Sequence, residues 1–355
     1  MSPRLRRADC SSPGLTRRRQ GKGFTYVDAD GERITEPEDL SRISELGIPP
    51  AWKDVWICPD ARGHLQATGI DAAGRKQYLY HPQWRTRRDA EKFDEMVRFA
   101  RALPKLREHV DADLAATEEL TRERVLACAV RLLDRGFFRI GSEQYTVQNE
   151  SFGLATMRKE HVTLNPDHTG MVFDYTAKSG KRRIQGVVDP DAFEVVSALK
   201  RRRGGGPELL AFKDGGRWYD VRSPDINEYL KDATGDDFSA KDFRTWAATM
   251  LAAIALAVSG EVAGTKTGKK RAVARAVKEV SHYLGNTPAV CRASYIDPRV
   301  IDAYQGGLII RGVLEEIADT DEVGELPIHQ PVIERAVLDL LNEREASPAL
   351  ERVAA

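Results

Sequence analysis

The most constraining feature of the sequence is a run of small and apolar residues, A-A-T-M-L-A-A-I-A-L-A, at positions 247–257. A helix that is apolar on every side has to be buried among other elements. The run follows K-D-F-R-T-W, so Arg244 lies where the helix begins. Because an unpaired buried charge is costly, Arg244 needs a partner.

The chain before this helix predicts a small β-rich domain over residues 23–85. Asp30-Gly31 separates two short runs and is a strong hairpin signal, and residues 72–75 separate two further strand candidates. Residues 39–46 are expected to form a short helix between them.

Residues 86–312 predict a larger, mainly helical domain. Apolar residues recur at helical spacing over 93–100, where Pro104 is expected to interrupt the helix, and over 121–135, where Gly136 follows the end. Residues 161–188 return to strand patterns, with A-K-S-G-K as a hairpin turn. The expected class is α+β: a small β-rich N-terminal domain and a helical domain with an embedded β-hairpin.

Length and composition fit this division. A chain of 355 residues is too long for one compact core. Residues 1–22, rich in Arg, Ser, Pro and Gly, are expected to be a disordered basic tail, and residues 313–355 an acidic, then helical, C-terminal tail.

We expect a cytoplasmic, nucleoid-associated protein, because neither a signal peptide nor a membrane-spanning run is evident. The cysteines are widely spaced, which predicts reduced thiols.

Charge is segregated although the net charge is zero. Acidic residues gather at 315–322, and basic residues gather at 17–19, 85–88, 178–183, 200–203 and 266–275. A neutral total taken alone counts against a nucleic-acid partner. A protein of this kind can nevertheless present one basic face to phosphates, and solvated surface is the alternative for any single cluster.

The usual parts of metal-dependent hydrolysis and of nucleotide turnover are missing, since the sequence has neither HExxH nor GxxxxGK[ST]. Cations on defined elements remain. Arg139 in F-F-R-I-G is either paired in the core or directed into a cleft, and Lys178 at the A-K-S-G-K turn either projects into a groove or only solubilises the turn. Each signal is weak by itself.

Together and in order, F-F-R-I-G, A-K-S-G-K, K-D-F-R-T-W and L-G-N-T-P…S-Y resemble the small poxvirus and bacterial type IB DNA topoisomerases. G-I-P-P-A-W-K-D-V-W-I-C-P and G-I-D-A-A-G-R-K-Q-Y-L-Y-H resemble that family's β-rich DNA clamp, so the likeness covers about residues 23–310. It implies the catalytic fold shared with tyrosine recombinases, and duplex DNA as the partner of a monomer that clamps it.

The resemblance implies a transesterification in which Tyr295 attacks a phosphodiester and forms a 3′-phosphotyrosyl link. Arg139 and Arg244 match the arginines that bind the transition-state oxygens, a role that suits planar, always-charged donors. Lys178 matches the lysine that protonates the leaving 5′-oxygen. Neither ATP nor another cofactor is expected, because the bond energy is kept and fixed cations stand where other enzymes use metals.

Asn286 departs from the poxvirus pattern, which has histidine nine residues before the tyrosine, and agrees with bacterial members. An amide can still donate one neutral hydrogen bond to a phosphate oxygen, but it cannot transfer a proton. A plain helix-boundary role is compatible with both.

The resemblance also indicates DNA contacts, which are Gln77, Tyr78, Tyr80, Tyr145 and Lys241. Packing is the alternative for the strand tyrosines. Two other functions compete with the topoisomerase: a tyrosine recombinase, although its usual His-x-x-Arg box is missing, and a non-catalytic DNA-binding protein.

Overall fold

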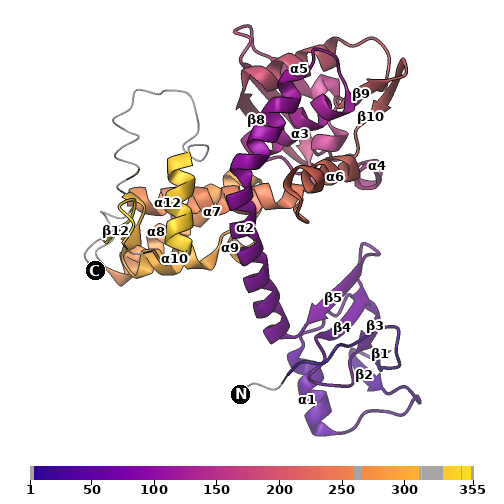
Figure 1. The fold of residues 1–355 in the computed structure, drawn as a ribbon. Coiled ribbons are helices and arrows are strands. Elements are labelled where there is room, and N and C mark those ends of the chain that lie inside the picture. The colour runs from indigo at the N-terminus through magenta and orange to yellow at the C-terminus, as the bar shows by residue number, and fades with distance from the viewer. Residues whose placement is uncertain (1–3, 260–264, 312, 314–330, 345, 353–355) are drawn as a thin grey trace. The chain divides into compact units, whose positions relative to one another are not determined.

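The computed structural model describes residues 4–259, 265–311, 313, 331–344 and 346–352. The chain divides into two compact units, Met1–Lys92 (unit 1) and Phe93–Ala355 (unit 2) (Figure 1). The α+β class predicted from the sequence is confirmed. Among the described helices, none combines the length and apolar character that crossing a membrane requires.

Unit 1 is an antiparallel sheet with a helix beside it. In its described part the strand order is β2-β1-β3-β4-β5, and Leu15, Ile43, Val55, Ile57 and Ala67 form the core. The elements are β1 (Leu15–Gln20), β2 (Gly23–Val27), α1 (Pro37–Glu45), β3 (Lys53–Ile57), β4 (Leu65–Ile70) and β5 (Lys76–Tyr80).

The predicted disordered tail is wrong for residues 15–20, which form β1 and pair with both β2 and β3. Leu15 is buried, and the Arg17 guanidinium donates to the main-chain oxygens of Pro49 and Trp52 at 3.1 and 2.6 Å. The arginine-rich composition of this run does not indicate a strand. An arginine can nevertheless belong to a sheet, because its methylene groups pack on the sheet while its guanidinium donates to main-chain carbonyls.

The turns of unit 1 correct a second expectation. The hairpin at 72–75 is confirmed, since it joins β4 and β5. Asp30-Gly31 makes a turn after β2, but the run that follows pairs only through an isolated bridge between Val27 and Arg33. The hairpin of this region is instead β1–β2, turned at Gly21 with φ +55°.

Helix α2 (Pro82–Ala115) crosses the boundary between the units, which lies at residues 92/93 rather than at the predicted 85/86. Pro104 does not interrupt α2, contrary to the expectation. Its missing N–H costs one helical hydrogen bond. Burial of one face on both sides of it, including Phe99, Leu103, Leu106 and Val110, holds the helix together.

Unit 2 places a small sheet, β6-β7-β8, among helices. The predicted strands of 161–188 are confirmed, and the turn between β7 and β8 carries Ser179 and Gly180 at φ 68° and 70°. A second hairpin, β9–β10, was not predicted, because its strands are short and charged. The elements are α3 (Arg122–Gly136), α4 (Glu143–Asn149), β6 (Val162–Leu164), β7 (Gly170–Ala177), β8 (Lys181–Val188), α5 (Pro190–Arg201), β9 (Ala211–Asp214), β10 (Arg217–Asp220), α6 (Ser223–Thr234), and short 3₁₀ turns at Leu154–Thr156, Lys159–His161 and Lys178–Gly180.

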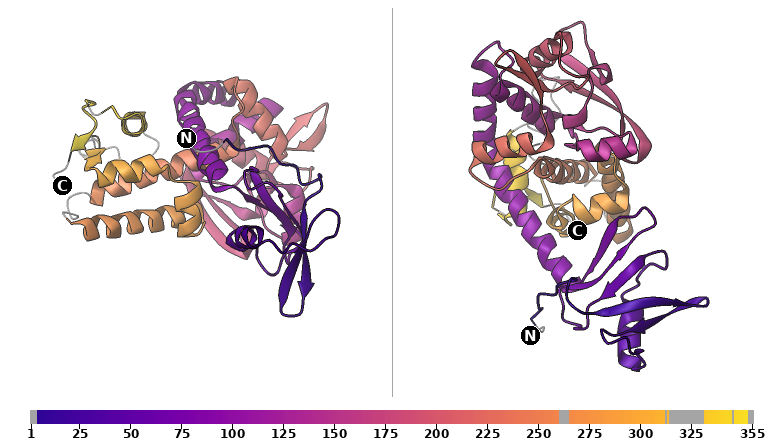
Figure 2. Two further views of the ribbon diagram at one scale, coloured as in Figure 1. Left: turned by 90° about the horizontal axis from the view of Figure 1, so that it is seen from below. Right: turned by 90° about the vertical axis from the view of Figure 1, so that its right-hand side faces the viewer.

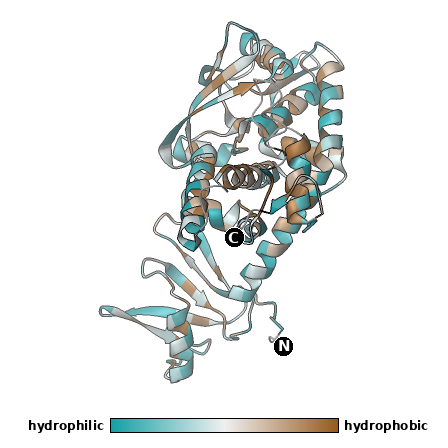
Figure 3. Ribbon diagram, turned by 90° about the vertical axis from the view of Figure 1, so that its left-hand side faces the viewer, coloured by the Kyte–Doolittle hydropathy of each residue, from teal (hydrophilic) through white to brown (hydrophobic). Residues whose placement is uncertain are grey.

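The second half of unit 2 packs around α7 (Ala240–Ser259), whose buried residues confirm the expected enclosed helix. Helices α7 and α8 lie side by side (Figure 2). Figure 3 colours much of the helical ribbon brown, which marks apolar residues. The remaining elements are α8 (Lys266–Leu284), α9 (Pro288–Ser294), α10 (Pro298–Gln305), β11 (Leu308–Ile309), α12 (Pro331–Leu341) and β12 (Glu351–Arg352).

The predicted C-terminal tail contains a helix, α12, that is part of the core rather than an appendage. Ile333, Val337 and Leu340 are buried, and Arg107 of α2 donates to Glu334 at 2.7 Å. Most of the acidic part of that tail, residues 314–330, lies outside the described residues.

Candidate active site

A cavity of about 280 Å³ in unit 2 brings together residues predicted from distant motifs. Arg139 follows α3, Lys178 lies at the β7–β8 turn, Asn286 joins α8 to α9, and Tyr295 caps the end of α9. All of them line this cavity, together with Ser179, Lys181, Gly285, Thr287 and Val290.

The position of Arg139 depends on the way α3 ends. Gly136 is the last helical residue, and Phe137 takes the left-handed conformation at φ 54°. A side chain on Gly136 would collide with the ring of buried Phe138, so glycine serves close packing here. Phe137 and Phe138 are both buried, so they fix the main chain directly before Arg139. From this position the Arg139 guanidinium donates to Gly285 O, at 3.2 Å, and to Asn286 Oδ1.

The contact with Arg139 orients the Asn286 amide. A guanidinium can only donate, so the amide oxygen has to face Arg139 and the Nδ2 group is left to donate elsewhere. Within the described part of the chain, this buried Nδ2 makes no geometrically sound hydrogen bond. It lies beside the Cys291 thiol, a weak acceptor. The site therefore holds a neutral donor available for a stronger acceptor.

Arg244 lies on the first turns of α7, is 4% exposed and is not part of the cavity lining. It donates to Phe137 O and, at 2.8 Å, to Leu284 O. Its Cζ lies 5.5 Å from the centre of the Tyr295 ring. Burial, helped by the nearby Arg139 guanidinium, lowers the pKa of Arg244 to about 10. Arg244 is thus a cation at neutral pH that gains from any anion placed beside it.

The C-terminal end of α8 organises these cations. Besides Arg139 and Arg244, Arg183 of β8 donates to His282 O at 3.2 Å and to Tyr283 O. The last carbonyls of a helix lack helical partners and carry partial negative charge, so they are suitable acceptors. Guanidinium groups that would repel one another are thereby gathered around one helix end, which is turned by Gly285 at φ 63°.

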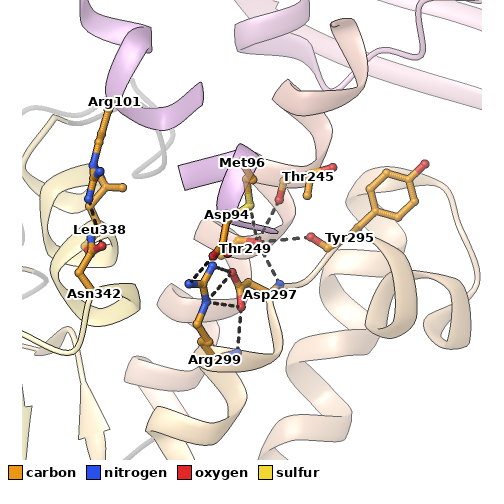
Figure 4. Close-up of polar contacts among 10 residues, drawn as sticks. All are labelled: Asp94, Met96, Arg101, Thr245, Thr249, Tyr295, Asp297, Arg299, Leu338 and Asn342. Carbon is orange, nitrogen blue, oxygen red and sulfur yellow. Dashed lines mark hydrogen bonds and ion pairs between the residues drawn. The ribbon is translucent and has the colours of Figure 1, made fainter. Parts of the chain in front are cut away.

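Tyr295 leaves α9 with its N–H donating to Cys291 O at 3.0 Å. Thr287 caps the start of α9 and Pro288 follows it. Figure 4 shows the main chain of Tyr295 beside Thr249 and its side chain pointing away from that residue. The ring is partly buried against the core. The phenol is therefore held at its base, with its ring beside Arg244 and within the cavity lining.

The candidate DNA contacts of unit 1 lie on β5, an edge strand. Tyr78 and Tyr80 are 45% and 38% exposed, and their rings stack with centroids 6.2 Å apart. Gln77 does not share this face, because successive residues of a strand point to opposite sides. Its amide donates to Asp71 at 2.9 Å.

Of the other candidates, Lys241 is exposed on the first turn of α7 and does not line the cavity. Tyr145 belongs to α4, and its side chain lies outside the described residues. Sequence reasoning missed Thr249 and Asp297, which contact the tyrosine segment from α7 and from the start of α10, and did not single out Arg183. The basic run 178–183 was the one available signal for Arg183.

The chain matches known proteins over most of its length. Residues 81–308 match the model of the eukaryotic DNA topoisomerase I catalytic core, and residues 23–71 match that of the bacterial DNA topoisomerase IB N-terminal domain. The chain is 30% identical to DNA topoisomerase 1B of Acanthamoeba polyphaga mimivirus over 82% of its own length and 88% of that protein's. It is 21% identical to vaccinia virus (strain Copenhagen) DNA topoisomerase 1B, over 77% and 87% of the two chains. It is 32% identical to Schizosaccharomyces pombe DNA topoisomerase 1 over 45% of its length and 19% of that protein's. These matches confirm the resemblance drawn from the motifs: the chain belongs to the type IB DNA topoisomerase family.

Proposed function

We propose that this protein relaxes positive and negative DNA supercoils without ATP, by single-strand transesterification through a 3′-phosphotyrosyl intermediate. One observation carries the proposal: Arg139, Lys178, Asn286 and Tyr295 line a single cavity with Arg244 against the tyrosine ring. These side chains come from four separate motifs, so their meeting supports a shared chemical role.

In the proposed reaction, the Tyr295 oxygen attacks phosphorus and gives up its proton to solvent water, while the bond from phosphorus to the 5′-oxygen breaks. Lys178 gives a proton to that oxygen, which leaves as a 5′-hydroxyl. The reverse steps rejoin the strand, and no bond energy is lost between them. This balance is why neither ATP nor another energy source is needed.

Arg139, Arg244 and the Asn286 amide are proposed to bind the non-bridging oxygens as negative charge develops on them. Two features support this. Arg244 Nε and Asn286 Nδ2 are buried donors that make no well-formed hydrogen bond among the described residues; the neighbours of these two side chains include the Tyr295 phenol and the Cys291 thiol, both weak acceptors. A phosphate would satisfy both and offset the mutual repulsion of the arginines.

DNA is proposed to be held by a monomer, with Tyr78 and Tyr80 of unit 1 among the contacts and Lys241 and Tyr145 as further candidates. The exposed aromatic face of β5 and the cation beside it support this, since Lys76 Nζ lies 5.7 Å from the Tyr78 ring centre. The expected setting is the cytoplasmic nucleoid. Binding through lysine and arginine releases counterions, so affinity should fall steeply with salt.

The decisive experiment is relaxation of negatively and positively supercoiled plasmid by the full chain, in EDTA and without ATP. We expect relaxation of both, and none by Tyr295→Phe, which lacks the attacking oxygen but keeps the ring. Wild-type protein that binds the plasmid and leaves it supercoiled would indicate a non-catalytic DNA-binding protein. Joined products from paired sites would indicate a recombinase.

A further inference from the structure

We infer that Thr249 and Asp297 are positioning residues that fix the main chain of Tyr295 to α7, so that the phenol is aligned with the arginines. The inference rests on the proposed function and assigns roles to two residues outside the cavity lining. Neither is required to touch DNA.

The Thr249 hydroxyl joins three segments in the core of unit 2, and Thr249 is fully buried. It accepts a hydrogen bond from the Asp297 N–H at 3.2 Å. Its one proton can go to Thr245 O at 3.0 Å, to Tyr295 O at 3.3 Å or to Met96 Sδ of α2 at 3.4 Å. A hydroxyl has one proton to give but can accept independently of where it gives it. The bond from the Asp297 N–H therefore persists whichever acceptor receives the proton.

Asp297 fixes the other side of the same segment. Its side chain is fully buried, accepts from the Arg299 N–H at the start of α10, and is paired with the Arg299 guanidinium at 2.7 Å. Arg299 reaches on to Asp94 of α2 at 3.1 Å (Figure 4). Asp297, two residues after Tyr295, is thus connected to α7, to α10 and, through Arg299, to α2.

Helix α7 also carries Arg244, the arginine beside the Tyr295 ring. Arg244 lies five residues before Thr249 on that helix, so the arginine beside the ring and the anchor of the tyrosine main chain belong to one rigid element. In-line attack tolerates little displacement, and a misplacement of about 1 Å can cost roughly a hundredfold in rate. Loss of the anchor should therefore slow attack without weakening DNA binding.

The principal test compares two buried threonines of α7 in the full chain. Thr249→Val removes the hydroxyl at constant shape, whereas Thr245→Val removes a hydroxyl whose hydrogen bond in the described structure goes to Lys241 O of the same helix. We expect single-turnover formation of the covalent adduct on a nicked oligonucleotide duplex to fall about ten- to a hundredfold for Thr249→Val. Thr245→Val should remain near wild type, and Thr249→Ser, which restores the hydroxyl, should recover most of the rate.

Two readouts separate positioning from general loss of structure. The Kd for DNA should be unchanged, and a substrate with a 5′-bridging sulfur should not rescue Thr249→Val, because a better leaving group does not realign the nucleophile. Equal rates for the Thr249 and Thr245 valine variants would overturn the inference while leaving the proposed function intact. Failure of the wild type to form any adduct would instead overturn the proposed function.

Asp297→Asn provides the test if Thr249→Val does not fold. Asparagine still caps α10 but weakens the pair with Arg299, so we expect a smaller loss of cleavage rate, about tenfold, again with unchanged Kd. The matched control is Asp94→Asn, which weakens the exposed outer contact of Arg299 and should cost less than Asp297→Asn. A wild-type rate for Asp297→Asn would contradict its positioning role.

Discussion

The proposed catalytic cavity of unit 2 and the proposed DNA-contacting β5 face of unit 1 are built in opposite ways. Cavity arginines donate to main-chain carbonyls at the end of α8, and Arg244 is almost fully buried. Tyr78 and Tyr80 stand exposed on an edge strand and stack on each other. Catalysis requires charged groups that are already in position when the transition state forms. DNA binding instead requires accessible side chains that can adjust to the duplex.

We expect the largest loss of cleavage rate from substitution of Arg244. Arg244→Ala removes a proposed transition-state donor and leaves Phe137 O and Leu284 O without its hydrogen bonds. We therefore expect a fall in the single-turnover cleavage rate on the order of 10³-fold. Arg244→Lys should recover little, because one ammonium cannot reproduce the planar fork that bonds two carbonyls.

Arg183→Lys is the matched control for that variant. Arg183 also donates to carbonyls of α8, but it does not line the catalytic cavity. Its substitution should cost much less than Arg244→Lys. Similar losses would mean that the helix end as a whole, and not the position of Arg244 at the tyrosine, sets the rate.

The next effect concerns Lys178, which lines the same cavity but is exposed on a turn. Lys178→Ala should slow cleavage on the order of 10²-fold, as expected for loss of a general acid. Sulfur in place of the 5′-bridging oxygen should restore most of the rate, because a thiolate leaves without a proton. Lys181→Ala, the other lysine of this lining, should show no such rescue. A defect in Lys178→Ala that sulfur does not relieve would rule out proton donation to the leaving group.

The cavity could be predicted from the sequence to the extent that its parts lie in short motifs. The cap at Thr287, the β7–β8 turn and the apolar helix after Arg244 each have a local signal. Contacts made across the fold have none: the Thr249 hydroxyl meets a main-chain group 48 positions away, and the partners of Arg244 are carbonyls, which every residue has. The β1 strand and the continuity of α2 through Pro104 likewise depend on burial, which overrides local preference.

The smallest effect is predicted on the β5 face, where the contacts are adaptable. Tyr78→Ala or Tyr80→Ala should weaken DNA binding about five- to tenfold, the value of one surface hydrogen bond or stacking contact. The cleavage rate at saturating protein should be unchanged, because neither side chain belongs to the cavity.

Tyr219→Ala is a close control, since Tyr219 is also 45% exposed and stacks on Phe212 with centroids 5.5 Å apart. Titration of labelled duplex at several salt concentrations measures all three. If Tyr219→Ala lowered affinity as much as Tyr78→Ala, exposed aromatic area in general, and not the β5 face, would account for the loss. If Tyr78→Ala instead slowed cleavage at saturating protein, DNA binding by the β5 face and catalysis in the cavity would be coupled. The two regions would then not have separate roles.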